Sequence, residues 1–120
     1  YNDVDGAETD PVAAMQVNAF GVRSLAAVAR ETGAVLVHYG TDFVFDGTAD
    51  HPYDESVPPG PQSVYATSKL LGEWFARGAP RHYVLRVESR FGGGAEAVAV
   101  VGDTAETDRG GRRSQACVRA

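Results

Sequence analysis

Cysteine and histidine are scarce in this chain of 120 residues. The one cysteine, Cys117, excludes an internal disulfide, and its polar surroundings hold none of the groups that activate a thiol. The three histidines are too scattered along the sequence to indicate a metal site; they are His38, His51 and His82. We therefore expect neither a structural disulfide nor a bound metal.

Positive charge and long apolar runs are also scarce. Eleven basic residues stand against 16 acidic ones, a net charge of −5, so the chain would repel nucleic acid phosphates. No apolar run approaches the roughly 20 residues that a membrane span needs, and the first residues show no charged-then-apolar leader. We expect a cytoplasmic protein whose partners include neither nucleic acid nor membrane.

A third absence concerns glycine. No Gly-x-Gly-x-x-Gly motif precedes the first expected helix, although dinucleotide-binding folds open their first β-α unit with this motif and hold the pyrophosphate there. At 120 residues and 43% hydrophobic content, the chain is an ordinary globular sequence of one domain at most. If the chain has such a fold, the half that carries the motif is missing from it.

The first long helix is predicted to begin at Asp10-Pro11 and to run to about Thr32, with Gly33 ending it. Apolar residues recur at helical spacing over a wide arc; they are Val12, Met15, Ala19, Val22, Ala26 and Ala29, flanked by Val17, Phe20, Leu25 and Val28. An arc this wide indicates packing against a sheet on one side. The other side packs against a second body or is simply buried in the core, and both alternatives stay open.

A short β-branched apolar run at 34–39 predicts a strand buried on both faces of a parallel sheet. Thr41 then lies at the carboxyl end of this strand, where open α/β sheets bind their ligands. A hydroxyl there can hydrogen-bond a substrate carbonyl. The alternative is that Thr41-Asp42 merely caps a turn, which both residue types favour.

The next segment, 48–63, is rich in Pro, Asp and Gly and is predicted to lack regular structure. Loops of this length in compact domains are usually functional. A helix is expected at about 64–77, ending at Gly78, and a second parallel strand at 82–87.

Tyr65 and Lys69 stand four residues apart on this second helix, so their side chains project from one face with Cβ atoms about 5–6 Å apart. A free tyrosine has a pKa of about 10, and a neighbouring ammonium favours its phenolate form. The pair alone also fits a solvated helix surface. Its interpretation therefore depends on the surrounding sequence.

Several stretches together resemble the extended short-chain dehydrogenase/reductases, in particular the dTDP-4-dehydrorhamnose reductase-like, sugar-nucleotide-binding branch. The central stretches are GTDFVFDG at 40–47, DESVPPGP at 54–61 and VYATSK at 64–69; the others are VDGAE at 4–8, VNA at 17–19 and LRVESRFG at 85–92. This resemblance covers the chain from Tyr1 to about Gly93. It implies an α/β fold, the second half of a Rossmann-like doubly wound parallel sheet.

The resemblance also implies roles for single residues. Tyr65 resembles the catalytic acid that protonates the developing alkoxide, and Lys69 resembles the residue that lowers the tyrosine pKa and bonds the nicotinamide ribose; both would contact NADP or NAD. Thr41 resembles the hydroxyl that orients the substrate oxygen. Asn18 matches a helix Asn that holds a water of the proton relay, although a mid-helix Asn can also serve packing. Gly40 departs from the pattern, since many relatives carry a second small hydroxyl residue there.

The implied activity is that of an NAD(P)H-dependent reductase of a nucleotide-linked 4-keto sugar, as in dTDP-rhamnose biosynthesis. A sugar-nucleotide epimerase or dehydratase uses the same three residue types, and a non-catalytic regulatory subunit with this fold is a further alternative. In relatives the second body beside the long helix is often a helix of another subunit, so a homodimer through helices is one alternative and simple core burial is the other. The fragment by itself is expected to be inactive.

From Gly92 onward the composition changes. Residues 1–93 are expected to form the second half of the NAD(P)-binding domain, whereas 94–120 contain glycines and four arginines but little that could form a core. Our hypothesis is that 94–120 are disordered or non-native sequence, with native divergence as the alternative.

Overall fold

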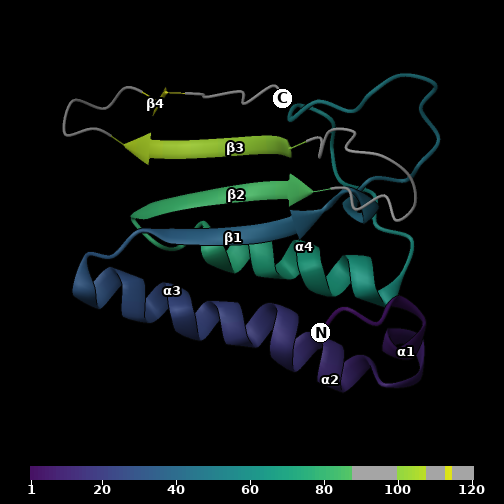
Figure 1. The fold of residues 1–120 in the computed structure, drawn as a ribbon, viewed down its shortest axis with the longest axis horizontal. Coiled ribbons are helices and arrows are strands. Elements are labelled where there is room, and N and C mark those ends of the chain that lie inside the picture. Colours follow the sequence, from purple (N-terminus) through teal and green to yellow (C-terminus); the bar gives the residue numbers. More distant parts are fainter. Residues whose placement is uncertain (88–99, 108–112, 115–120) are drawn as a thin grey trace, which may run out of the picture.

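The computed structural model describes residues 1–87, 100–107 and 113–114 of the chain. A layer of helices packs against a sheet with the strand order β1-β2-β3-β4 (Figure 1). Strands β1 (Leu36–Thr41) and β2 (Arg81–Val87) are parallel, and Leu36 lies opposite His82 at one end of the ladder and Thr41 opposite Val87 at the other. The expected α/β fold with a parallel strand pair is confirmed.

Two further strands, β3 (Val100–Thr107) and β4 (Arg113–Ser114), continue the sheet in antiparallel pairing. Both lie within the segment 94–120, for which the sequence predicted an atypical tail. The sheet is therefore mixed. The boundary between 93 and 94 stays a prediction.

A short helix that the sequence did not predict, α1 (Val4–Thr9), opens the chain. It forms because the carboxylate of Asp3 accepts a hydrogen bond from the backbone N–H of Gly6 at 2.8 Å, which caps the first turn. The helix buries Ala7. Asp10 then caps the next helix by accepting from the N–H of Ala13 at 3.0 Å, and Pro11 occupies the first turn as expected.

The long helix runs over Pro11–Thr32 and consists of α2 (Pro11–Met15), a π-helical turn η1 (Gln16–Phe20) and α3 (Gly21–Thr32). Gly33 ends it with a left-handed φ of 71°, a conformation that favours glycine. These bounds confirm the prediction. By length and composition alone the helix could cross a membrane, which corrects the expectation that no run comes near that length; core helices of soluble proteins also meet this criterion, and here the helix packs along α4.

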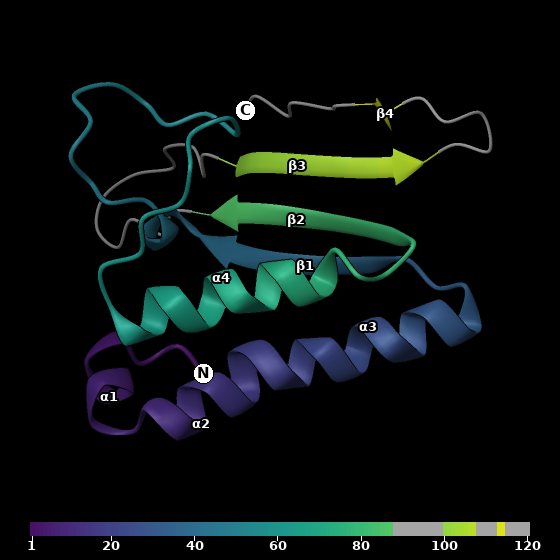
Figure 2. The same cartoon turned by 180° about the vertical axis from the view of Figure 1, so that it is seen from behind.

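Helix α4 (Val64–Ala76) follows the loop and is capped by Ser63, whose hydroxyl accepts from the N–H of Ala66 at 3.1 Å. In Figures 1 and 2, α4 lies between the long helix and the strands. The opposite face of β1 has no helix over it among the described residues. Val35, Val37 and Tyr39 are accordingly 42%, 47% and 59% exposed. The prediction that this strand is buried on both faces is thus wrong for this structure.

Small residues allow the helices to approach closely. Val22, Ala76 and Val84 join α3, α4 and β2 in one buried cluster. At Gly72 a Cβ atom would stand 2.2 Å from the backbone oxygen of Asn18, so only glycine permits α4 to touch the π-helical turn.

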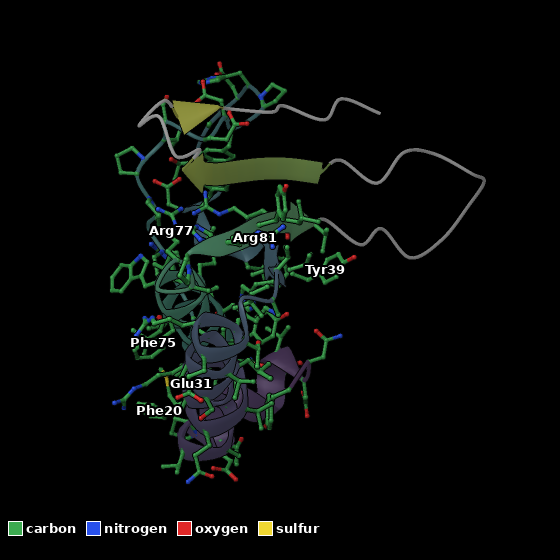
Figure 3. All side chains as sticks on the ribbon, turned by 90° about the vertical axis from the view of Figure 1, so that its left-hand side faces the viewer. Phe20, Glu31, Tyr39, Phe75, Arg77 and Arg81 are labelled. Carbon is green, nitrogen blue, oxygen red and sulfur yellow. The ribbon has the colours of Figure 1, made fainter. Side chains whose placement is uncertain are left out.

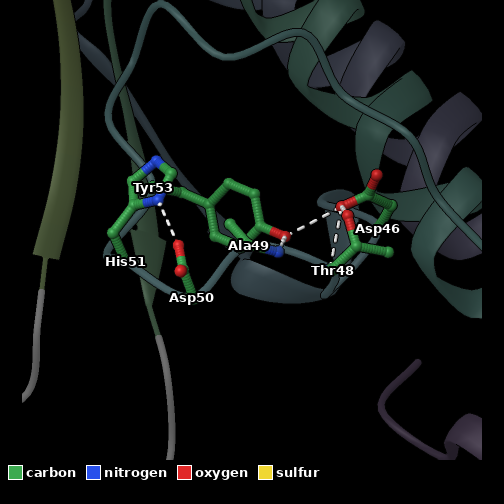
Figure 4. Close-up of polar contacts among 6 residues, drawn as sticks. All are labelled: Asp46, Thr48, Ala49, Asp50, His51 and Tyr53. Carbon is green, nitrogen blue, oxygen red and sulfur yellow. Dashed lines mark hydrogen bonds and ion pairs between the residues drawn. The ribbon is translucent and has the colours of Figure 1, made fainter.

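The segment 48–63 contains no helix or strand, as predicted, but polar contacts order its first part (Figure 4). The carboxylate of Asp46 accepts from the N–H of Thr48 at 3.1 Å, from its hydroxyl at 3.0 Å and from the hydroxyl of Tyr53 at 2.8 Å. These bonds lower the pKa of Asp46, chiefly through the N–H of Thr48. The Tyr53 ring stacks on Phe45 with ring centres 4.4 Å apart.

Candidate functional site

Thr41, Tyr65 and Lys69 line one cavity of about 480 Å³ at the carboxyl end of β1. The strand contributes Thr41 and helix α4 contributes the other two. Asn2, Asp42 and Phe43 also line it. The structure therefore brings together three of the four residues that the sequence singled out.

Tyr65 is only 6% exposed. Its ring packs in a cluster with Ala7 and Ala14, and the ring of Phe43 meets it edge-on with centres 6.1 Å apart. Its hydroxyl donates a hydrogen bond to the side-chain oxygen of Asn2 at 3.0 Å. The Tyr65 side chain thus has packing contacts on its ring and a hydrogen bond at its hydroxyl.

The pKa of Tyr65 is raised above its ordinary value, mainly by burial and further by the negative charge of Asp42, while a hydrogen bond with Thr41 opposes the shift. The family resemblance predicts that Lys69 lowers this pKa, whereas in this structure burial and Asp42 raise it. The Nζ of Lys69 donates to the backbone oxygen of Tyr39 at 2.7 Å.

Lys69 itself has a lowered pKa because burial disfavours the charged amine, and the carboxylate of Glu73 partly offsets this. His38, on the buried face of β1, has its pKa lowered to about 4 by burial and by the charge of Lys69. The imidazole is therefore neutral at physiological pH. Its Nε2 is buried and has no hydrogen-bond partner.

Thr41 has two structural roles. Its hydroxyl donates to the carboxylate of Asp42 at 3.1 Å and accepts from the N–H of Phe43 at 3.3 Å, so it caps the short 3-10 helix η2 (Asp42–Val44). It also lines the cavity. Thr41 thus both caps the turn, as one alternative predicted, and lies in the cavity, as the other predicted.

Asn18 is buried in the π-helical turn and does not line this cavity. Its side-chain amide donates to the hydroxyl of Ser68 at 3.0 Å, and that hydroxyl donates to the backbone oxygen of Tyr65 at 2.7 Å. Asn18 therefore reaches the site only through the backbone of α4. Helical turns of the π type often occur at functional sites.

Sequence reasoning missed a buried ion pair beside the cavity. Arg86 on β2 donates to both carboxylate oxygens of Glu73 on α4, at 3.0 Å, 3.2 Å and 2.8 Å. The Glu73 side chain is 0% exposed and that of Arg86 is 9% exposed. An arginine beside the apolar residues Val84, Leu85 and Val87, and a glutamate one helical turn after Lys69, were the available signals.

A second cavity of about 620 Å³ adjoins the loop and is lined by Phe45, Asp46, Tyr53 and Arg86, among others; Asp42 and Phe43 border both cavities. Within the described residues no group of three His, Cys, Asp or Glu side chains is placed to hold a metal ion.

Comparison with known protein families identifies the family to which the chain belongs. The family model described as RmlD substrate binding domain matches residues 1–110. This chain belongs to the RmlD substrate binding domain family. The match to this family extends past Gly93, where the resemblance by motifs ended, and includes β3.

Known proteins similar to this RmlD-family chain include a dTDP-4-dehydrorhamnose reductase of Sinorhizobium fredii, 46% identical over 96 residues that cover 77% of the chain and 32% of that protein. Similar solved structures include a dTDP-4-dehydrorhamnose reductase of Bacillus anthracis in complex with NADP (TM-score 0.69, 37% identity) and one of Clostridium acetobutylicum (TM-score 0.70, 40% identity); each match covers 72% of this chain and 31% of the other. The chain thus spans about a third of the length of the relatives it matches.

Proposed function

We propose that this chain is part of an NAD(P)H-dependent reductase that acts on a nucleotide-linked 4-keto sugar. The observation that carries the proposal is the convergence of Thr41, Tyr65 and Lys69 on one cavity. A hydroxyl, a phenol and an ammonium together suit the reduction of a carbonyl, which needs hydride delivery and proton transfer at the same centre. The reductases among the relatives, one of them in complex with NADP, support this assignment.

The residues present fit the nicotinamide end of NADP or NAD. The ammonium of Lys69 and the phenol of Tyr65 face a common cavity and offer hydrogen bonds to ribose hydroxyls. The bound cofactor supplies a hydride to the carbonyl carbon. Since this sequence has no Gly-x-Gly-x-x-Gly before its first long helix, the residues here would hold the nicotinamide ribose but not the pyrophosphate.

In this proposal the side chains of the chain perform the proton transfer. The hydroxyl of Thr41 orients the substrate oxygen, and the hydroxyl of Tyr65 donates its proton to the alkoxide that develops there. The raised pKa of Tyr65 keeps the phenol protonated and thus able to act as an acid. Asn18 completes the proposed set; its side-chain amide bonds Ser68 and does not line the cavity.

The proposed partners are a nucleotide sugar and a second copy of the chain, and the proposed location is the cytoplasm. Apolar side chains stay exposed on the helices: Phe20 is 48%, Leu25 is 58% and Trp74 is 58% exposed. Figure 3 shows Phe20 and Phe75 together on one side of the molecule, away from Tyr39. This side supports the proposed homodimer through helices.

Two other functions share the fold. A sugar-nucleotide epimerase or dehydratase would use the same Thr, Tyr and Lys, and a regulatory subunit would use none of them for chemistry. Turnover in a longer protein that contains this chain separates these possibilities. With NADPH and a dTDP-4-keto sugar, we expect stoichiometric oxidation of the cofactor. Conversion of a dTDP-hexose in the presence of NAD(P)+ without net change of the cofactor would indicate an epimerase or dehydratase, and sugar-nucleotide binding without any conversion would indicate a regulatory subunit.

A further inference from the structure

The buried ion pair between Glu73 and Arg86 begins one helical turn after the proposed catalytic lysine on α4. Glu73 follows Lys69 by four residues on α4, so the two side chains share one face of the helix. Arg86 reaches this face from β2 and bonds both carboxylate oxygens. The pair thus ties the strand that follows α4 to the helix that carries Tyr65 and Lys69.

The guanidinium of Arg86 also contacts an aromatic ring. It lies over the ring of Phe45, 4.9 Å from the ring centre, so the charge is held between an aromatic face and a carboxylate. A charge buried without a partner is strongly unfavourable, whereas a bidentate pair with further contacts is tolerated. The orientation of Glu73 is therefore determined by residues on β2 and after η2.

The carboxylate also packs against the backbone that Lys69 holds. A Cβ atom at Gly40 would stand 2.4 Å from the Oε1 of Glu73, so glycine leaves the space that the carboxylate fills. Gly40 follows Tyr39, whose backbone oxygen accepts the hydrogen bond from the Nζ of Lys69. The departure noted at Gly40 in the sequence thus has a physical explanation, namely room for Glu73.

We propose that Glu73, held by Arg86 and seated against Gly40, is a positioning residue that keeps the Lys69 ammonium charged and directed at the carboxyl end of β1. This inference deepens the proposed function, because it concerns the same site. Glu73 itself is fully buried and lines neither of the two cavities described above. Its effect on Lys69 agrees with the direction in which it moves the pKa of that amine, against the effect of burial.

Other groups also surround the ammonium, and a test must separate Glu73 from them. They come from every element packed here: Tyr65 on α4, His38 on β1, Asp42 on η2 and, through Glu73, Arg86 on β2. His38 is neutral above its pKa of about 4, so it adds no charge in the alkaline range where a lysine titrates. The Asp42 carboxylate remains in place in all the variants proposed below.

The sequence offers a direct measurement, since Lys69 is its only lysine. In a longer protein that contains this chain, labelled with 13C at lysine Cε, the NMR signal that is absent from a Lys69→Arg variant reports the titration of this amine. Glu73→Gln should move the midpoint to lower pH. Glu55→Gln is the matched control, because it removes a carboxylate from the loop, and it should leave the midpoint unchanged.

Glu73→Gln leaves Arg86 without its ionic partner, so a second variant guards against misfolding. Replacing both residues by Met removes the two charges and keeps apolar volume, a change that is often neutral for stability. The Lys69 midpoint should again move to lower pH, and the amine should react faster with an acylating reagent. An unchanged midpoint in this variant, with helical circular dichroism intact, would overturn the proposal. The titration needs no cofactor or substrate, so its outcome is independent of whether the proposed reaction is right.

Discussion

At the scale of residues, the family resemblance of the surrounding stretches selected Tyr65, Lys69 and Thr41. Helix periodicity and the carboxyl end of a strand then predicted that these side chains lie close together. The direction of the Tyr65 pKa could not be predicted this way. It depends on burial and on Asp42, and both follow from tertiary packing. Asn2, the hydrogen-bond partner of the phenol, lies 63 residues away in sequence and gave no signal.

Thr41 is predicted to act through its hydroxyl alone. Thr41→Val keeps the shape of the side chain but removes the group that orients the substrate oxygen, so kcat/KM of a longer protein containing the chain should fall by about 10²-fold. Loss of the η2 cap should also cost about 1 kcal/mol of stability. Thr67→Val, at an exposed position on α4, is the matched control. Parent kinetics in Thr41→Val would exclude Thr41 from the site.

His38 is predicted to make stability depend on pH. Its pKa is about 4 in the folded chain and about 6.5 when unfolded, so between these values the unfolded state binds more protons. Stability from the neutral imidazole is complete above about pH 6.5 and is lost as the pH falls towards 4. Urea midpoints at pH 7.5 and pH 4.5 should therefore differ more for the parent than for His38→Gln. The exposed His51→Gln should behave as the parent; equal pH dependence in all three would contradict the prediction.

At the scale of elements, the long helix was predictable because Asp10-Pro11 and Gly33 mark its ends by local chemistry. Helix α1 was missed because a single cap at Asp3 decides it within a polar stretch. The π-helical turn at Asn18 could not be anticipated either. It lies where α4 approaches most closely, and that contact joins residues far apart in sequence.

Gly72 is predicted to be required for this contact. In Gly72→Ala the new Cβ would meet the Asn18 backbone oxygen, so the helices must separate, which should cost about 1–3 kcal/mol of unfolding free energy. Gly21→Ala is the control, since its Cβ would have an ordinary contact of 3.5 Å and alanine favours helices. Chemical denaturation of both variants checks this. A Gly72→Ala variant as stable as Gly21→Ala would show that the close approach is not needed.

At the scale of the whole molecule, the α/β class and the parallel strand pair followed from alternating apolar strands and helices. The exposure of one face of β1 could not be predicted from the sequence, because an apolar run alone does not show which face of a strand packs against a helix. Val35, Val37 and Tyr39 are exposed as a result, and one edge of β1 pairs with no described strand.

This uncovered surface predicts the behaviour of the isolated 120-residue chain. An open apolar strand edge favours association between molecules, so we expect low stability, aggregation and no turnover. Light scattering and a cofactor-binding titration measure this directly. Val37→Lys should reduce aggregation by placing a charge on the exposed strand. A monomer that unfolds cooperatively and binds NAD(P)H with a Kd near 1 μM, about −8 kcal/mol, would contradict the expectation.

The central claim is that Tyr65 donates the proton in carbonyl reduction, and Tyr65→Phe tests it most directly. In a longer protein that contains this chain, single-turnover oxidation of NADPH by a dTDP-4-keto sugar should slow by about 10²–10⁴-fold, while NADPH binding stays nearly unchanged because the ring remains. Tyr83→Phe, the same change on β2 away from the cavity, should keep the parent rate. A Tyr65→Phe protein that retains more than half of the parent rate would contradict the account.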